Sequence, residues 1–430
     1  MTDITPSDTQ KRAIDAIKQW FKNDTKKQQV FRLFGYAGTG KSTVLKCVLA
    51  ELGLEAHDDC SPGVVTATFT GKAALVLRRK GTPARTIHSL IYSVIEASDE
   101  QIKEAQKGIA AAEESCRALT GFERTCAEAG IEAMRQALRG MKHPRFGLNP
   151  QSDAADCKLI VLDEVSMVGE DMAADLLSFN KPILVLGDPG QLPPIRGEGA
   201  FTQVQPDVML TEIHRQAETS AIIRLATMAR NGEPIAMGQY DEFVAKLPKG
   251  AISPEQALRG GQLICGMNAT RLDLNNAMRH AAGFNGGALP TGSGEKIICL
   301  KNQNDKGLIN GMFLTLDDVV DEGDLYFSAV VKDDEGNAIG NNGSNRLRVY
   351  KGHFLDHIQL DKERHDRDWK EKRKYVEATF GWAITCHKAQ GSQWENIIVW
   401  DDGLGRTEED RRRWLYTAIS RAERGLVLLA

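Results

Sequence analysis

Residues 35–43 of the 430-residue chain, GYAGTGKST, have the composition and spacing of a phosphate-binding loop. They follow the apolar run VFRLF at 30–34 and match the pattern G-x4-G-K-[ST]. In such a loop, backbone N–H groups and the next helix cradle phosphates, the lysine reaches the β and γ phosphates, and the hydroxyl binds Mg²⁺. We therefore expect ATP and Mg²⁺ as ligands. The expected binding residues are Gly35, Gly38, Thr39, Gly40, Lys41, Ser42 and Thr43.

Two carboxylates emerge where another apolar run, 159–162, ends. We expect Asp163 to hold Mg²⁺ together with Ser42, and Glu164 to polarise the attacking water. The alternative is that the pair only caps the next helix. A further run, PILVLGD, is followed by Gln191, whose amide could sense the γ-phosphate or orient the water. The sequence therefore predicts a hydrolytic nucleotide site.

Hydrolysis also needs positive charge beside the γ-phosphate, which arginine fingers supply. The candidates are Arg215 in LTEIHRQ and Arg421 in LYTAISRAERG, although a single arginine is more commonly a surface residue. Gln10 precedes the first expected helix, and its amide could read the adenine edge with a paired donor and acceptor. A lone glutamine is usually also a surface residue.

Parallel α/β sheets would position these residues. In the first 200 residues, apolar runs at 30–34, 64–69, 159–164 and 182–188 alternate with helix-like stretches. Two of the four runs end in Asp or Glu and a third is followed by Gly35, and ligands in open α/β sheets bind where strands end. A second set predicts a second α/β domain. Its runs lie at 262–266, 295–300, 396–400 and 425–430.

Three regions depart from this alternation. Residues 98–141 are rich in Ala, Glu and Lys with apolar residues at helical intervals, which predicts an αα hairpin that turns near TGFERT. Residues 305–355 combine Gly, Asn and Asp with short alternating segments, as in a small β-barrel. Residues 362–374 mix basic and acidic side chains and are either a solvated connector or a phosphate contact.

Composition excludes several classes of protein. With 42% hydrophobic and 26% charged residues, the chain is typical of a globular protein. Its eight cysteines form no CxxC pair or zinc-ligand spacing, which favours reduced thiols in the cytoplasm. We expect no signal peptide, membrane span or membrane partner. The net charge of −4 does not exclude nucleic acid, because a basic groove can lie in an acidic protein.

Eight motifs in order resemble those of superfamily 1 (1B) DNA helicases, and most closely the RecD-like group that includes the phage Dda helicase. The similarity spans roughly residues 10–430. The motifs are GYAGTGKST, TFTGKAA, TIHSL, LDEVSM, GDPGQLPPI, LTEIHRQ, AITCHKAQGSQWENIIV and YTAISRAERG.

The resemblance implies a role for each matching residue. Gln10 would read adenine, Gln191 would sense the γ-phosphate, Arg215 and Arg421 would be arginine fingers, and Gln390 and Gly391 would link strand grip to the nucleotide. Residues from both halves would hold the backbone of single-stranded DNA. These residues are Thr70, Gly71, Lys72, Thr86, His88, Thr385, His387 and Lys388. Phe69, Trp382 or Trp394 could stack bases, or could simply pack in the core.

The resemblance also implies a domain organisation. RecA-like domain 1A would comprise 1–90 and 142–200, with a helical insertion 1B at 91–141. RecA-like domain 2A would comprise 201–304 and 375–430. An SH3-like barrel insertion 2B, with its connector, would occupy 305–374. The family carries a β-hairpin pin where this chain has the helical insertion, so that insertion could act as a wedge, a clamp, a brace or a protein-docking arm.

The resulting expectation is a monomeric ATP-dependent helicase that translocates 5′ to 3′ on single-stranded DNA and opens duplex junctions in a bacterial or phage-infected cell. Its partners would belong to replication, recombination or repair. An alternative is an ATP-gated clamp or recruitment module that binds nucleic acid without unwinding it. A nuclease on the same chain is disfavoured, because no carboxylate cluster remains after the motifs are assigned.

Overall fold

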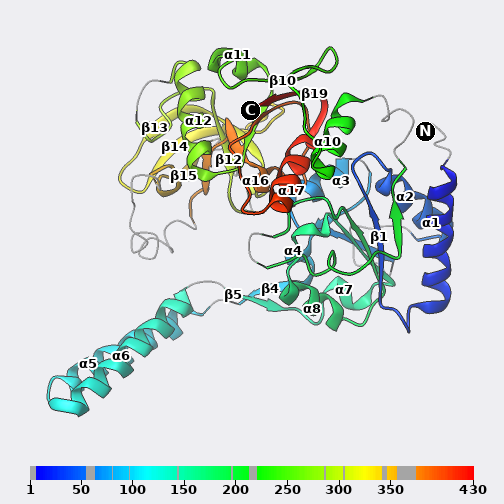
Figure 1. Ribbon diagram of the computed structural model, residues 1–430. Helices are drawn as coiled ribbons and strands as arrows, with labels where there is room; N and C mark the ends of the chain where they lie inside the picture. Colours follow the sequence, from blue (N-terminus) through cyan, green and yellow to red (C-terminus); the bar gives the residue numbers. More distant parts are fainter. Residues whose placement is uncertain are drawn as a thin grey trace.

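The described part of the chain folds around two six-stranded sheets, a five-stranded antiparallel sheet and a two-stranded ribbon, and Figure 1 shows their arrangement. The two six-stranded sheets are built mainly from parallel strands. The computed structural model describes residues 6–54, 63–79, 81–95, 97–142, 145–194, 197–212, 220–284, 287–303, 306–340, 346–355 and 374–430.

The first sheet is entirely parallel, with strand order β3-β2-β6-β7-β1-β8. The four apolar runs predicted as strands in the first 200 residues are β1, β2, β6 and β7, so that prediction is confirmed. The strands are β1 (Val30–Gly35), β2 (Val64–Thr68), β3 (Arg85–Thr86), β6 (Leu159–Asp163), β7 (Ile183–Gly187) and β8 (Val208–Leu210).

Helices cover both faces of this sheet. Because side chains alternate along a strand, Leu159 and Val161 of β6 pack with α1 and α2, whereas Ile160 and Leu162 pack with α4 and α8. The helices of this unit are α1 (Asp8–Gln19), η1 (Trp20–Asp24), α2 (Lys41–Glu51), α3 (Gly71–Arg79), α4 (Ile87–Ile91), α7 (Asp153–Asp156), η2 (Val165–Met167) and α8 (Glu170–Ser178).

The second sheet has the order β17-β11-β18-β19-β10-β9, in which only the short edge strand β9 is antiparallel. Its strands are β9 (Gly238–Gln239), β10 (Val244–Leu247), β11 (Gln262–Cys265), β17 (Ala383–Thr385), β18 (Trp394–Trp400) and β19 (Ala422–Leu429). Its helices are α10 (Ala221–Asn231), α11 (Pro254–Arg259), α12 (Asn268–Ala281), α16 (Cys386–Ala389) and α17 (Glu408–Ile419).

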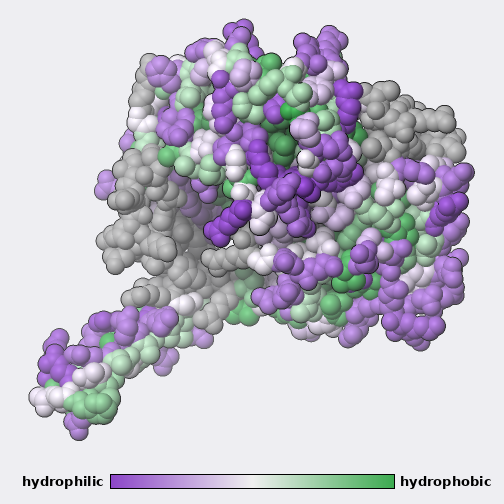
Figure 2. All heavy atoms as spheres, in the orientation of Figure 1, coloured by the Kyte–Doolittle hydropathy of each residue, from purple (hydrophilic) through white to green (hydrophobic). Residues whose placement is uncertain are grey.

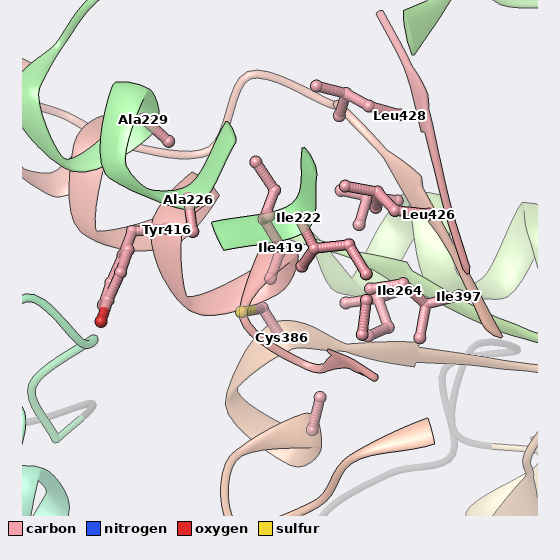
Figure 3. Close-up of a cluster of buried hydrophobic side chains, with 14 of the residues drawn as sticks. Ile222, Ala226, Ala229, Ile264, Cys386, Ile397, Tyr416, Ile419, Leu426 and Leu428 are labelled. Carbon is pink, nitrogen blue, oxygen red and sulfur yellow. The ribbon is translucent and has the colours of Figure 1, made fainter. Parts of the chain in front are cut away.

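Two apolar layers cover this second sheet. One contains α10, α16 and α17 packed on β18 and β19 through residues such as Ile222, Ile397, Ile419 and Leu426 (Figure 3). The other contains Ala257 of α11 and Met278 of α12. The predicted α/β class with two parallel sheets is therefore confirmed.

The third sheet is antiparallel, with the order β15-β14-β13-β12-β16. The prediction that residues 295–300 form a strand of the second parallel sheet was wrong, because β12 pairs antiparallel with β13 and β16. A continuous apolar run signals burial on both faces but does not specify strand partners. The elements are β12 (Glu295–Cys299), β13 (Phe313–Asp321), β14 (Tyr326–Lys332), β15 (Arg346–Tyr350), α13 (Gly352–Leu355) and β16 (Ala378–Phe380).

This antiparallel sheet has its own apolar core, which includes Leu316, Phe327 and Val349. It draws β12 and β16 from outside the range 305–374 predicted for the barrel insertion. The SH3-like character of the insertion and the domain boundaries stay predictions. Of the predicted connector at 362–374, residues 362–373 lie outside the described residues.

A helical arm projects from the first unit (Figure 1). It consists of β4 (Tyr92–Ile95), α5 (Asp99–Cys116), α6 (Gly121–Lys142) and β5 (Arg145–Leu148), with β4 and β5 paired antiparallel at its base. The arm has a small core of its own, formed by Ile109, Cys116 and Ile131. Hydrophilic and hydrophobic residues are interleaved along its surface (Figure 2). None of the helices in the described ranges is long and apolar enough to span a bilayer.

Candidate nucleotide and nucleic-acid site

The phosphate-binding loop connects β1 to α2 at the carboxyl edge of the first sheet. Gly38 and Gly40 have φ values of 80° and 83°, which a residue with a β-carbon rarely adopts. Gly40 precedes α2, and no side chain caps this helix end. The helix therefore presents its positive N-terminal dipole at the loop, where phosphate oxygens are stabilised.

Lys41 lies folded across this loop. Its Nζ atom donates to the carbonyl oxygens of Gly35 at 2.5 Å and Tyr36 at 3.3 Å, and Thr39 Oγ1 also donates to Tyr36 at 2.8 Å. A β-carbon at Gly35 would lie 2.5 Å from Thr39 Oγ1, so the loop needs glycine there. The lysine is thus preorganised inside the loop, where phosphate oxygens could replace its carbonyl partners.

Gln10 contacts the same loop from α1. Its side chain is buried, and Nε2 donates to the Thr39 carbonyl oxygen at 3.1 Å. Its Oε1 atom accepts from Ser7 N–H at 3.0 Å, which completes the capping box of α1. The structure thus brings Gln10 beside the loop, and adenine reading stays a prediction for it.

Asp163 is the last residue of β6 and Glu164 follows it; β6 lies two strands away from β1 in the sheet. Glu164 has a left-handed φ of 55°, and its N–H donates to Asp163 Oδ1 at 2.8 Å. Glu164 precedes η2 but makes no side-chain cap, which argues against the alternative that it only caps a helix. Backbone strain of this kind in a residue with a β-carbon costs about 1–3 kcal/mol and is concentrated at functional sites.

Ser42 and Asp163 fit the donor set that Mg²⁺ takes in nucleotide sites. Ser42 is exposed in the first turn of α2, and Asp163 lies at the end of β6, two strands from β1. Within the described ranges, no group of three or more His, Cys, Asp or Glu residues could hold a metal ion. A magnesium ion bound by one hydroxyl and one carboxylate keeps waters and takes phosphate oxygens as further ligands. The site therefore fits Mg²⁺ carried in with a nucleotide.

The second unit docks directly on this site through Tyr416 of α17. Ala37 N–H donates to the Tyr416 hydroxyl at 2.9 Å, and that hydroxyl donates to the carboxylate of Asp188, which directly follows β7. Asp188 is buried, and burial raises its pKa, whereas the charge of Lys41 lowers it. Sequence reasoning missed both Asp188 and Tyr416, although each lies inside a quoted motif and Asp188 occupies a strand end.

Gln191 lies at the same contact between the first and second units, which we call the seam. Its N–H donates to the Asp188 carbonyl oxygen at 3.2 Å, and its buried Oε1 has no hydrogen-bond partner among the described residues. The next residue, Leu192, accepts from Gln390 Nε2 at 2.9 Å and donates from its N–H to Thr417 Oγ1 at 2.9 Å. Elements from opposite ends of the chain therefore form one continuous wall around the loop.

The two predicted arginine fingers have different outcomes. Arg215 lies outside the described residues. Arg421 is buried, and its guanidinium donates to the carbonyl oxygen of Thr417 at 3.0 Å and to Ser420 Oγ at 3.0 Å. In this structure Arg421 thus bonds to groups of its own unit, and its role at the γ-phosphate stays a prediction.

Gly391, predicted to link strand grip to the nucleotide, lies against Thr70, which is predicted to contact DNA from the first unit. This glycine has a φ of 75°, and a β-carbon there would lie 2.5 Å from Thr70 Oγ1 and 2.9 Å from Ala73 Cβ. Thr70 Oγ1 also accepts from Ala73 N–H at the start of α3. Gly71 is packed as closely, because a β-carbon there would lie 2.1 Å from Ile309. The first unit therefore touches both later sheets at this point.

Lys72 lies among aromatic side chains of the second half of the chain. Its Nζ atom is 4.5 Å from the Phe313 ring centroid and 4.6 Å from that of Trp394. Burial lowers the pKa of Lys72 to about 8; the nearby Asp334 opposes this shift and the charge of Lys296 adds to it. Sequence reasoning did not identify Phe313 as part of this contact. Of the three predicted stacking residues, Trp394 thus already lies against a cation.

Thr86 and His88 lie at the base of the arm. Thr86 caps α4 by accepting from Ser89 N–H at 3.1 Å. His88 packs against the rings of Phe69, Tyr92 and the exposed Phe146, and burial lowers its pKa. A neutral imidazole in an aromatic cluster can donate one hydrogen bond to a phosphate but brings no charge.

On the second unit, Thr385 ends β17 and begins α16. Burial lowers the pKa values of both His387 and Lys388. Lys388 Nζ donates to Asn310 Oδ1 at 2.9 Å, which ties α16 to the loop before β13. Trp382 packs beside Phe284, away from Lys72 and Trp394, with ring centroids 6.3 Å apart.

Taken together, the fold and the site define an α/β nucleotide-binding protein whose phosphate loop is covered by a second parallel-sheet unit. Residues 6–244 match the family model described as AAA domain, and residues 380–429 match the model described as UvrD-like helicase C-terminal domain. The chain therefore belongs to the AAA domain family.

One similar protein of known function is a helicase. The chain is 27% identical over 422 residues to the ATP-dependent RecD2 DNA helicase of Deinococcus radiodurans, a match that covers 91% of this chain and 45% of that protein. Our chain thus spans less than half the length of this relative.

Solved structures of Pif1 helicases share the fold. One describes two coordinating Pif1 helicases at forked double-stranded DNA, with a TM-score of 0.52 and 18% identity, covering 100% of this chain and 92% of that chain. Another is Bacteroides Pif1 bound to single-stranded DNA, with a TM-score of 0.52 and 16% identity, covering 100% and 93%. The sequence matches confirm the predicted resemblance to superfamily 1B helicases of the RecD-like group, and these structures show that the fold is shared.

Proposed function

We propose that this chain is an ATP-dependent DNA helicase that translocates on single-stranded DNA. The observation that carries the proposal is the shared wall of the site, where Tyr416 and Thr417 of the second unit bond to Ala37 and Leu192 of the first. A nucleotide bound at such a wall contacts two bodies, so its binding and loss can close and open the cleft between them.

In this proposal the phosphate loop and Lys41 bind the phosphates, and Gln10 holds the adenine. Ser42 and Asp163 hold Mg²⁺, which would neutralise charge on the transferred phosphate. Glu164 accepts the proton of the attacking water, and Gln191 orients that water. Arg215 and Arg421 supply positive charge when the units close further.

Strand contacts lie on both sides of the same seam. Thr70, Gly71, Lys72, Thr86 and His88 belong to the first unit. Thr385, His387 and Lys388 belong to the second. The meeting of Gly391 with Thr70 supports the proposal that these groups grip one strand alternately as the cleft closes and opens. Gly391 then relays the strand grip to the nucleotide.

We further propose the domain division 1–90 with 142–200, 91–141, 201–304 with 375–430, and 305–374. The antiparallel sheet with its own core supports a separate insertion in the second unit. Movement from 5′ to 3′, action at duplex junctions, a monomeric state and partners in replication, recombination or repair rest on the helicase resemblance. Structures of Bacteroides Pif1 bound to single-stranded DNA, and in complex with ADP-AlF₃ and single-stranded DNA, support the two ligand classes.

The test uses two partial duplexes, one with a 5′ single-stranded tail and one with a 3′ tail, together with ATP and Mg²⁺. We expect displacement of the strand from the 5′-tailed substrate only, and ATP hydrolysis that single-stranded DNA stimulates. DNA-stimulated hydrolysis without displacement of either substrate would favour the clamp, and displacement from the 3′ tail alone would contradict the polarity.

A further inference from the structure

One tyrosine hydroxyl joins the second unit to two separate parts of the nucleotide site. The Tyr416 ring is buried in the apolar cluster of α10, α17 and the second sheet, and its hydroxyl points out of that cluster (Figure 3). It accepts from Ala37 N–H in the phosphate loop and donates to Asp188 after β7. A single side chain therefore bonds to the loop and to the neighbouring strand end at once.

Asp188 faces the residues expected to handle phosphate and water. Its other carboxylate oxygen accepts from Gly190 N–H at 2.9 Å, and the carboxylate interacts electrostatically with Lys41 and Glu164. A carboxylate that is 3% exposed needs hydrogen-bond donors to offset its lost hydration. Docking of Tyr416 supplies one of these donors, and undocking removes it.

A second contact holds the same part of the loop. The guanidinium carbon of Arg230, in the last turn of α10, lies 3.6 Å from the ring centroid of Tyr36. The Tyr36 ring meets the Tyr416 ring edge-on, with centroids 6.5 Å apart. Adjacent loop residues are thus held from the second unit by two helices that share one apolar cluster.

We propose that Tyr416 is a positioning residue whose hydroxyl transmits docking of the second unit to the phosphate loop, so that nucleotide binding and strand binding are energetically coupled through it. The identity of the two ligands rests on the proposed function. A bond present only in the docked state favours whichever ligand favours docking, and such coupling is reciprocal between two ligands.

The test compares Tyr416→Phe, which keeps the ring and removes the hydroxyl, with the matched control Tyr240→Phe. Tyr240 lies in the same unit, and its hydroxyl donates to the Ala236 carbonyl oxygen at the surface. The affinity for a fluorescent oligo(dT) is measured by anisotropy with and without ADP-aluminium fluoride and Mg²⁺. Melting curves and circular dichroism establish that both variants fold.

For Tyr416→Phe we expect the effect of nucleotide on DNA affinity to shrink by about tenfold, because the lost bond has a charged acceptor. DNA-stimulated kcat should fall by about the same factor while KM for ATP stays within about twofold. A variant that merely weakened the fold would change melting and KM instead. If Tyr416→Phe matches Tyr240→Phe in coupling and in kcat, the inference is overturned.

The same hydrogen bond can be tested through its acceptor, on the first unit, with Asp188→Asn. In a double-mutant cycle, the effects of Tyr416→Phe and Asp188→Asn on coupling should be strongly non-additive, and additive effects would contradict the inference. If Tyr416→Phe fails to fold, Asp188→Asn alone must reduce the coupling. A wild-type protein that couples nucleotide to DNA but displaces no strand refutes the helicase proposal only, whereas absent coupling in the wild type refutes this inference.

Discussion

A β-carbon at Gly391 would lie 2.5 Å from the hydroxyl of Thr70, across the boundary between the two parallel-sheet units. Gly391→Ala should therefore lower the urea midpoint and impair strand-dependent ATP hydrolysis. The left-handed backbone costs about 1–2 kcal/mol per residue with a β-carbon, and overpacking adds about 1–3 kcal/mol. Gly53→Ala is the matched control, because Gly53 has a φ of 62° but no atom of the described residues within 4 Å of the added carbon. Equal effects of the two substitutions would show that the close approach to Thr70 is unimportant.

Lys41→Ala should abolish ATP hydrolysis, with a loss of at least about a thousandfold, because its ammonium is the charge held inside the phosphate loop. The fold should persist, since the hydrogen bonds of the side chain within the described residues go to the local carbonyl oxygens of Gly35 and Tyr36. Phosphate release is the measurement, and Lys22→Ala on the exposed surface is the control. Hydrolysis by Lys41→Ala at the rate of the control would defeat the assignment of the loop.

Lys72 should make stability depend on pH in the alkaline range. Its pKa falls from 10.5 to about 8 on folding, because burial disfavours the ammonium. Below pH 8 both states hold the proton and the full cost of burying the charge is present. Between about pH 8 and 10.5 the unfolded chain binds the proton more tightly, so stability rises with pH.

Urea midpoints of the wild type and Lys72→Met, compared at pH 7.5 and 10, measure this effect. The urea midpoint of the wild type should rise relative to that of Lys72→Met as pH rises, because methionine keeps the apolar contact and has no proton to release. Lys27→Met, at a lysine whose side chain is 83% exposed, should leave the difference from wild type constant. A constant difference for Lys72→Met as well would show that the ammonium is not desolvated.

The buried pair Arg279–Glu295 should fasten the antiparallel sheet to α12. The guanidinium donates to the carboxylate at 2.9 and 3.0 Å, and the two side chains are 3% and 0% exposed. Arg279→Met leaves a buried carboxylate without its partner, which should cost about 3–5 kcal/mol. Arg424→Met breaks the exposed pair with Glu395 and should cost at most about 1 kcal/mol. Equal urea midpoints for the two variants would contradict this assignment.

The arm should be removable. Ile95 and Arg145 are cross-strand partners at the end of the ribbon, so Asn-Gly can replace residues 96–144 as a two-residue hairpin turn. The arm core of Ile109, Cys116 and Ile131 is separate from the cores of the body. The melting temperature should therefore stay close to that of the wild type, and the rate of DNA-stimulated ATP hydrolysis should stay within about twofold of it. Strand displacement measured beside hydrolysis then reports whether the arm takes part in opening duplexes. Loss of the folded body would show that the arm is a brace.

Local patterns in the sequence specified the nucleotide loop and most strands of the parallel sheets. An apolar run that ends in Gly35, Asp163 or Gly187 indicates both a buried strand and the end of that strand, where ligands bind. The helical arm was equally readable, because 44 residues without proline and with helical periodicity have few other solutions. The run at 295–300 was misassigned because its partners β13 and β16 are chosen by long-range packing.

No local pattern in the sequence indicated which side chains contact each other across the seam. Tyr416 and Asp188 are separated by 228 positions, and their contact exists only because the second unit docks on the first. Lys72 was expected among phosphates, yet its charge lies between Phe313 and Trp394, which come from two other sheets. The type of each residue thus indicated its chemistry, whereas its contacts depend on how the second unit docks on the first.

The order of strands in the second sheet has a consequence for biosynthesis. Its central strands β18 and β19 begin at Trp394 and Ala422, whereas every strand of the first sheet has been made by Leu210. The first unit can therefore fold while the ribosome is still translating, but β10 and β11 must wait, with the backbone groups of their edges unpaired, for about 150 further residues. Chaperones that bind nascent chains would therefore bind this protein after β10 and β11 have been synthesised and before β18 and β19 have been.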